Sequence, residues 1–184
     1  MTHCCSILIA CIEESEDLSQ ETLDSLLLPL LPSFKSDNPT AFKLCGIVLR
    51  RTSAIVLNPL SHLLNKVLVG NNTSDDKNSE LEDHIYELIY ELHRVSQDLL
   101  IKVLPNICVQ LQAEEERIRF NAVRLLGKLF SSQYADYAME FNRNFRDYIG
   151  RLNDASNGIR LEMVENCSSI LKKKPNLLKF VEGL

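Results

Sequence analysis

Apolar residues recur every three or four positions along almost the whole chain, which is the pattern of amphipathic helices. The clearest example is residues 80–95, where the apolar series predicts one buried helical face formed by Leu81, Ile85, Leu88, Ile89 and Leu92. No convincing run alternates apolar and polar residues, which argues against a β-sheet. About ten helices are expected, near residues 2–14, 20–31, 39–56, 59–69, 80–95, 97–112, 115–130, 133–152, 157–172 and 175–183.

Helix starts are marked by residues that cap the free amides of a first turn. Ser19 is a candidate N-cap, and Asn38 followed by Pro39 is a second start signal. Asn58 and Pro59 repeat that device and predict another helix start. Each of these signals stands just before a series of apolar residues with helical spacing.

Two further features concern the middle of the chain. Ser96 is expected to cap a helix that continues to about residue 112, and Pro105 inside that helix should kink it. Residues 70–79 are polar and rich in residues that favour loops, so flexibility is expected there. Helical periodicity resumes immediately afterwards, which argues against a domain boundary in this loop.

One sequence motif occurs twice in the second half of the chain. An acidic loop, an Ile-Arg pair and a helix appear first around Ile118 and Arg119 and again around Ile159 and Arg160. A period of about 40 residues with two helices per unit is typical of HEAT and armadillo repeats. The sequence therefore predicts an all-α HEAT-repeat α-solenoid of about ten antiparallel helices, with residues 1–184 forming a single segment.

A solenoid needs polar outer faces at its two ends. This chain instead begins with an apolar helix and ends in Phe180-Val181-Glu182-Gly183-Leu184. We therefore interpret it as a segment of a longer protein. Repeat proteins of this class act as scaffolds that hold other proteins, so the repeat indicates binding and not catalysis.

Charge is unevenly distributed along the sequence. Residues 1–116 contain 8 Lys and Arg against 18 Asp and Glu, a net charge of −10, whereas residues 117–184 contain 12 against 7, a net charge of +5. The two halves could attract different partners, or solvated faces could simply differ in charge. The basic half lacks the concentrated Lys and Arg stripe that a nucleic-acid backbone selects.

The sequence contains no pattern that predicts catalysis, a metal or a cofactor. Six cysteines include no CxxC pair, and their helical positions predict reduced thiols in a nucleocytoplasmic compartment. The four histidines have no partner at metal-ligand spacing, apart from His3 beside Cys4. No signal peptide and no apolar run long enough for a membrane span are present. A cysteine-dependent enzyme remains as a distant alternative.

Four arginines are candidate functional residues. Arg119 and Arg160 occupy the repeat's arginine position, where an ion-pair ladder between neighbouring repeats is the expected role and partner contact the alternative. Arg143 and Arg151 lie on or near the end of a helix between repeats. Because arginine binds carboxylates and phosphates in a bidentate manner, these two are candidate partner-binding residues.

Two tyrosines and a lysine cluster complete the candidates. Tyr86 and Tyr90 lie one turn apart beside an apolar stripe, where a tyrosine suits an interface or packing against the adjacent repeat. Lys172-Lys173-Lys174 at a predicted helix C-terminus stabilises the helix dipole, with DNA or an inositol polyphosphate as the alternative contact.

Several segments in the same order resemble the precocious-dissociation-of-sisters family of cohesin regulators. They are Ser19-Gln20-Glu21-Thr22-Leu23-Asp24, Leu31-Pro32, Asp83-His84-Ile85-Tyr86-Glu87-Leu88-Ile89-Tyr90-Glu91-Leu92, Asp98-Leu99-Leu100-Ile101-Lys102-Val103-Leu104-Pro105, Glu115-Glu116-Arg117-Ile118-Arg119, Val123-Arg124-Leu125-Leu126-Gly127-Lys128-Leu129-Phe130, Asn142-Arg143, Gly150-Arg151-Leu152-Asn153-Asp154 and Ile159-Arg160-Leu161-Glu162. They span nearly the whole chain, so the resemblance is more specific than the repeat alone.

The resemblance implies a piece of the N-terminal half of a long HEAT-repeat protein in the nucleus, associated with chromatin indirectly through cohesin. Its implied partners are the kleisin subunit of cohesin, the wings-apart-like release factor and sororin-type factors, and its implied roles are cohesin release, acetylation and protection. The resemblance implies no cofactor and no membrane contact. A generic HEAT-repeat adaptor in nuclear transport or phosphatase assembly is the alternative.

Overall fold

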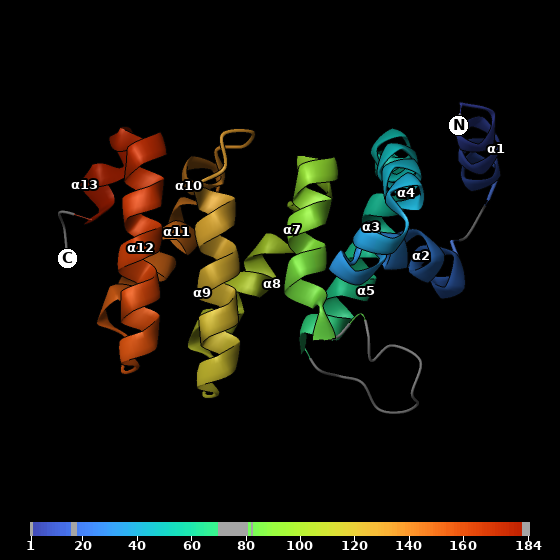
Figure 1. The fold of residues 1–184 in the computed structure, drawn as a ribbon. Helices are drawn as coiled ribbons and strands as arrows, with labels where there is room; N and C mark the ends of the chain where they lie inside the picture. Colours follow the sequence, from blue (N-terminus) through green and yellow to red (C-terminus); the bar gives the residue numbers. More distant parts are fainter. Residues whose placement is uncertain (1, 16–17, 70–80, 82, 182–184) are drawn as a thin grey trace. The chain divides into compact units, whose positions relative to one another are not determined.

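The described part of the chain is helical. A computed structural model describes residues 2–15, 18–69, 81 and 83–181, and within these ranges it contains α-helices and short 3₁₀-helices but no strand (Figure 1). The predicted flexible loop at residues 70–79, the predicted helix start at Glu80 and the chain end at 182–184 lie outside the described residues. The contacts divide the chain into two compact units, Met1–Val103 and Leu104–Leu184.

The first unit is built around one central helix. Its elements are α1 (Thr2–Glu13), α2 (Gln20–Leu27), the 3₁₀-helix η1 (Leu28–Leu30), α3 (Pro32–Asp37), α4 (Pro39–Arg51), α5 (Ser53–Val69), α7 (Ile85–Val95) and the 3₁₀-helix η2 (Gln97–Leu100). Helix α4 contacts α1, α2, α3, α5 and α7. Val48 and Leu49 on α4 are fully buried, so this helix forms the centre of the apolar core.

Two of the predicted helix starts in this unit are confirmed. The Ser19 hydroxyl accepts a hydrogen bond from the Thr22 amide at the start of α2. The Asn38 side chain accepts one from the Ala41 amide at 3.1 Å, directly before Pro39 begins α4. Local sequence signals were enough to predict these two helix starts, because each capping side chain accepts a hydrogen bond from a first-turn amide that its own helix leaves without a partner.

The predicted helix start at Asn58-Pro59 is wrong. Helix α4 ends at Arg51, α5 begins at Ser53, and Pro59 lies inside α5. A proline inside a helix costs about 3 kcal/mol or more. One continuous buried stripe on α5 runs across this position and offsets that cost; it consists of Val56, Leu60, Leu63 and Leu64.

The predicted kinked helix at 97–112 is also wrong. Residues 97–100 form the 3₁₀-helix η2, and a separate helix, α8, begins at Leu104. Ser96 precedes η2 in an extended conformation, and its side chain makes no capping hydrogen bond. Pro105 lies in the first turn of α8, where its missing amide removes no helical hydrogen bond.

The second unit comprises α8 (Leu104–Val109), η3 (Gln110–Gln112), α9 (Glu116–Phe130), α10 (Tyr137–Glu140), α11 (Asn142–Ile149), η4 (Gly150–Asn153), α12 (Asn157–Lys173), η5 (Pro175–Leu177) and α13 (Leu178–Val181). The two helices that contain the repeated sequence motif, α9 and α12, match their predicted ranges. The single helix expected at 133–152 is instead divided, because the backbone of Phe141 leaves the helical region at φ −108° and ψ 51°.

Helices α9 and α12 lie side by side in this unit (Figure 1). Gly127 on α9 permits the close approach, since a Cβ atom there would lie 2.3 Å from the Asn166 side chain of α12. The ring of Phe130 at the end of α9 meets the rings of Phe145 and Tyr148 on α11 at centroid distances of 5.0 and 5.1 Å. The two copies of the sequence repeat thus correspond to two neighbouring layers of the same unit.

Candidate protein-binding surface

Arg119 joins the two copies of the repeat. Its Nε and Nη2 atoms donate to Oδ2 and Oδ1 of Asp154 at 3.1 and 3.2 Å, a bidentate ion pair. Its Nη1 atom donates to the backbone carbonyls of Ala113 and Glu114 at 2.8 and 2.7 Å. One side chain of α9 therefore holds its own preceding loop and the loop before α12, which is the geometry that a repeat ladder requires.

Arg160 repeats half of this arrangement in the second copy of the repeat. Its Nη1 atom donates to the carbonyls of Asp154 and Ala155 at 2.6 and 3.0 Å. These two acceptors stand at the same offsets before Arg160 as Ala113 and Glu114 stand before Arg119. Within the described part of the chain, Arg160 has no carboxylate partner.

Asp154 is the centre of this cluster. Only 4% of the residue is exposed, and its carboxylate also accepts hydrogen bonds from Arg151 Nη1 at 3.3 Å and the Ser156 amide at 2.9 Å. Burial alone would raise the pKa of Asp154. The hydrogen bonds from Arg119 and Ser156 and the positive charges of Arg119 and Arg151 outweigh that effect, so its pKa is lowered.

The two arginines predicted to bind partners have different environments. Arg143 is exposed on α11. Arg151 is partly buried: it donates to the Leu111 carbonyl at 3.2 Å and to Asp154, and its Nε atom is buried without a hydrogen bond. Arg143 is thus presented to solvent, whereas Arg151 stabilises the loop around Asp154. A partner-binding role for either residue stays a prediction.

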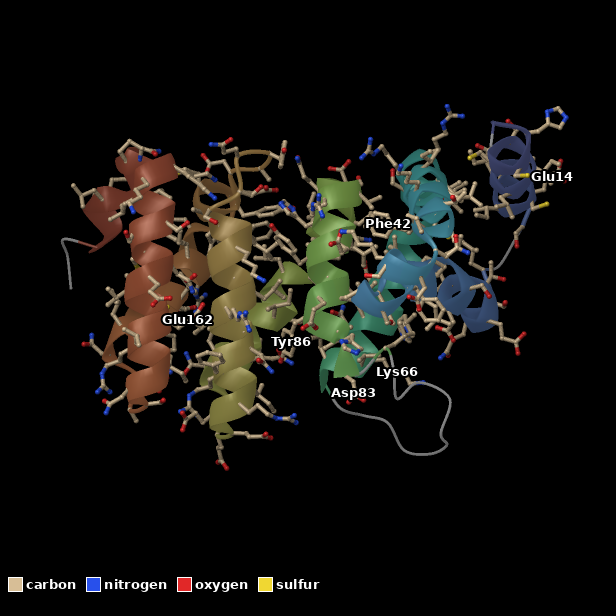
Figure 2. The ribbon with its side chains drawn as sticks, viewed as in Figure 1. Glu14, Phe42, Lys66, Asp83, Tyr86 and Glu162 are labelled. Carbon is tan, nitrogen blue, oxygen red and sulfur yellow. The ribbon has the colours of Figure 1, made fainter. Side chains whose placement is uncertain are left out.

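Tyr86 and Tyr90 are both half-buried on α7. The Tyr90 ring lies 6.4 Å from the His93 ring of the same helix, and Figure 2 labels Tyr86 near the start of α7. On an adjacent face of α7, Glu91 pairs with Lys35 of α3 at 3.0 Å and with Arg94 at 3.1 Å. These contacts fix α7 against α3, and the role of the two tyrosines in binding stays a prediction.

The possible metal ligands and the thiols of the described residues bear on what chemistry they can support. They contain no group of three or more residues suited to a metal ion, and no helix long and apolar enough to cross a membrane. Burial raises the pKa of the Cys45 and Cys167 thiols and raises that of Cys108 to about 12. A thiol with such a pKa is almost entirely protonated at neutral pH and is a poor nucleophile.

The family model described as "Sister chromatid cohesion protein PDS5 protein" matches residues 1–182. The chain belongs to this PDS5 family. It is 34% identical over 177 residues to PDS5 homolog A of Gallus gallus, and 33% identical to homologs A and B of Homo sapiens. Each match covers 96% of this chain but only 12–13% of the relative, so the chain spans about an eighth of their length.

The chain also resembles a solved structure described as "Structure of the Pds5-Scc1 complex and implications for cohesin function". The TM-score is 0.69 at 20% identity, covering 90% of this chain and 26% of the other. At that identity the likeness concerns the fold, and it confirms the predicted all-α HEAT-repeat solenoid class. That residues 1–184 form a single segment stays a prediction.

The sequence predicted an ion-pair role for Arg119 but did not identify its partner. The sequence marks an acidic loop before each repeat helix, and Asp154 lies in the second such loop. At the equivalent position of the first loop stands Ala113. Because the two loops differ at this position, comparison of the two copies could not show which loop residue forms the ion pair with Arg119.

Proposed function

We propose that this chain acts as a non-catalytic HEAT-repeat scaffold that regulates cohesin in sister chromatid cohesion. Membership of the PDS5 family, whose model matches residues 1–182, carries this proposal. The names of the relatives refer to sister chromatid cohesion. The raised pKa values of three buried thiols support binding over cysteine-dependent catalysis.

The proposed mechanism is docking of short peptide motifs or helices onto a groove between repeats. The kleisin subunit of cohesin is the first partner, and the likeness of the fold to a chain in the solved structure described as a Pds5-Scc1 complex supports it. The wings-apart-like release factor and sororin-type factors are further partners. Association with chromatin in the nucleus then follows from cohesin and needs no direct contact with DNA.

Arg143 is the residue that best suits a contact with such a partner. It is exposed on α11, and no carboxylate of the described residues pairs with it. An exposed guanidinium can therefore receive a partner's carboxylate without first losing an internal ion pair. Arg151 lacks this freedom because it already donates to Asp154 and to the Leu111 carbonyl.

The test is a pull-down from nuclear extract with the purified chain, followed by immunoblotting for the cohesin kleisin and the wings-apart-like factor. Wild-type protein should recover at least one of them, and Arg143→Glu should recover at least about tenfold less, because charge reversal repels an acidic partner. Arg124→Glu is the matched control, since Arg124 is an exposed arginine on α9 of the same unit.

Equal loss with Arg124→Glu would mean that overall charge, and not the α11 surface, governs binding. Recovery of neither cohesin factor by wild-type protein with a normal helical spectrum would contradict the proposal. Recovery of a nuclear-transport or phosphatase subunit in their place would favour a generic HEAT-repeat adaptor. Tyr86→Ala and Tyr90→Ala in the same assay would determine whether α7 contributes to the surface.

A further inference from the structure

Helix α4 presents a row of cations in an acidic part of the chain. Lys43, Arg50 and Arg51 are exposed on α4, and the helix contains no acidic residue. None of the three pairs with a carboxylate within the described part of the chain. Residues 1–103 contain 8 Lys and Arg against 15 Asp and Glu, so this row is a local reversal of the charge around it.

The exposed side of α4 lies between two neighbouring helices that are both in place. Helices α1 and α7 pack on α4, and Figure 1 shows them on either side of it. What remains exposed is a ridge formed by Lys43, Ile47 and Arg50, which have the i, i+4, i+7 spacing of one helical face. Ile47 is 37% exposed, so the ridge places an apolar side chain between two cations. We call these three residues the α4 ridge.

Contacts with α7 hold the α4 ridge in place. A Cβ atom at Gly46 would lie 3.6 Å from Cγ2 of Val95, the last residue of α7, so the two helices are close at this point. The Nε atom of Arg50 donates to the Val95 carbonyl at 2.8 Å. This bond fixes the guanidinium at the C-terminal end of α7, where a positive charge is favourable, while Arg50 stays exposed. A partner that binds here therefore meets a side chain that is already ordered.

The acids of α7 do not neutralise the α4 ridge. Glu91 is already paired with Lys35 and with Arg94. Lys35 also lies 4.6 Å from the centre of the Phe42 ring, which Figure 2 labels near α4, so Glu91 is held near the first half of α4. Because α7 runs beside α4 in the same direction, the exposed Glu87, one turn earlier, falls level with the start of α4 and before the ridge.

We propose that the α4 ridge binds a short acidic segment of a partner protein, in which one apolar side chain is flanked by carboxylates. Charge complementarity supports this occupant, because Lys43 and Arg50 can each receive a carboxylate and the arginine can do so in a bidentate manner. Exposed ion pairs alone are weak, so the apolar contact with Ile47 is needed as well. The proposal goes beyond the proposed function, because it concerns the first unit and requires no cohesin factor.

Fluorescence anisotropy with the purified full chain at low salt tests the proposal. The probe is a labelled alanine-rich helical peptide with one leucine and a glutamate one helical turn to each side of it. The wild-type chain should bind this peptide at least about tenfold more tightly than the same peptide with lysines in place of the glutamates. Lys43→Glu should weaken binding at least about threefold through charge repulsion. Ile47→Ser in the chain, or serine in place of the leucine in the peptide, should each do the same through loss of the apolar contact.

Matched controls are Lys66→Glu and Ile55→Ser, which make the same changes at exposed residues of α5. Both should bind the peptide like wild-type protein, and all variants should keep the wild-type helical spectrum. Equal binding of the lysine peptide, or an equal loss with Lys66→Glu, would overturn the proposal, since general charge would then govern binding. So would binding of inorganic tripolyphosphate but not of the peptide, which would assign the α4 ridge to a small polyanion. Because no cohesin factor is used, the outcome is separate from that of the pull-down.

Discussion

At the scale of single residues, Asp154 is a buried charge at the centre of a hydrogen-bonded cluster in the second unit. Its carboxylate is almost fully buried and accepts hydrogen bonds from Arg119, Arg151 and the Ser156 amide. Removing one member of a buried ion pair leaves the other charge without compensation. The stability of the loop before α12 therefore depends on this one side chain more than on any surface ion pair.

Asp154→Ala should lower the free energy of unfolding by about 3–5 kcal/mol, measured by urea denaturation. The control is Asp136→Ala, which removes a carboxylate 56% exposed and paired with Lys174 at 3.4 Å, and should cost at most about 1 kcal/mol. Similar losses in the two variants would show that the Asp154 cluster has no special role.

The lowered pKa of Asp154 also sets a pH dependence. Because its folded pKa lies below the unfolded value of about 3.9, its stabilisation is present above that value and is lost as pH falls through the folded pKa. Asp154→Asn should therefore flatten the decline in stability below about pH 4. An unchanged decline in stability below about pH 4 would contradict the assignment of this pH dependence to Asp154.

Cys108 provides a further prediction at this scale. Burial raises the pKa of its thiol to about 12, and the nearby Asp147 charge adds to this effect, against a hydrogen bond from Asn144. In the native protein at neutral pH, a maleimide should label the exposed Cys4 and Cys11 well before Cys108. Peptide mapping would locate the labels, and rapid labelling of Cys108 would revive the cysteine-enzyme alternative.

At the scale of elements, the packing of α12 on α9 depends on the absence of a side chain at Gly127. A Cβ atom there would lie 2.3, 2.5 and 2.6 Å from the three terminal heavy atoms of Asn166. Asn166 cannot withdraw freely, because its Nδ2 atom donates to the Val123 carbonyl and to Glu162. The close contact of the two repeat helices thus requires both residues.

Gly127→Ala should destabilise the protein by about 1–3 kcal/mol in thermal or urea unfolding, since the helices must separate or Asn166 must move. Gly150→Ala is the control: a Cβ atom there meets nothing within 4 Å, so stability should stay equal or rise by up to about 1 kcal/mol. Adding Asn166→Ala to Gly127→Ala should recover part of the loss. Additive losses in the double variant would argue against the contact.

The elements also show where sequence signals were sufficient. Asn38 and Ser96 both stand before a predicted helix and both can accept a hydrogen bond from a free helix amide. Of the two, only Asn38 forms a side-chain cap. Local rules predicted a helix start at Pro59 and a kink at Pro105, and both predictions were wrong. The buried stripe of α5 continues through Pro59, and α8 begins just before Pro105. Local chemistry defines the possible helix boundaries, and burial selects among them.

At the scale of the whole molecule, the chain combines a PDS5-family fold with an uneven charge. Stacked repeat layers such as α9 and α12 cover one another's faces, which leaves their outer surfaces for partners. A scaffold function is therefore the expectation that this architecture supports. The cohesin pull-down tests it.

The helical class, the repeat and the family resemblance all followed from sequence alone, because periodic apolar positions and repeated loop residues are local properties. The positions of Arg119 and Arg160 in the repeat followed in the same way. Tertiary contacts were needed to show that Asp154 receives Arg119, that Arg151 is held in the same cluster while Arg143 faces solvent, and that Val164 is exposed where Val123 is buried. Those distinctions depend on contacts between residues far apart in sequence, which periodicity does not encode.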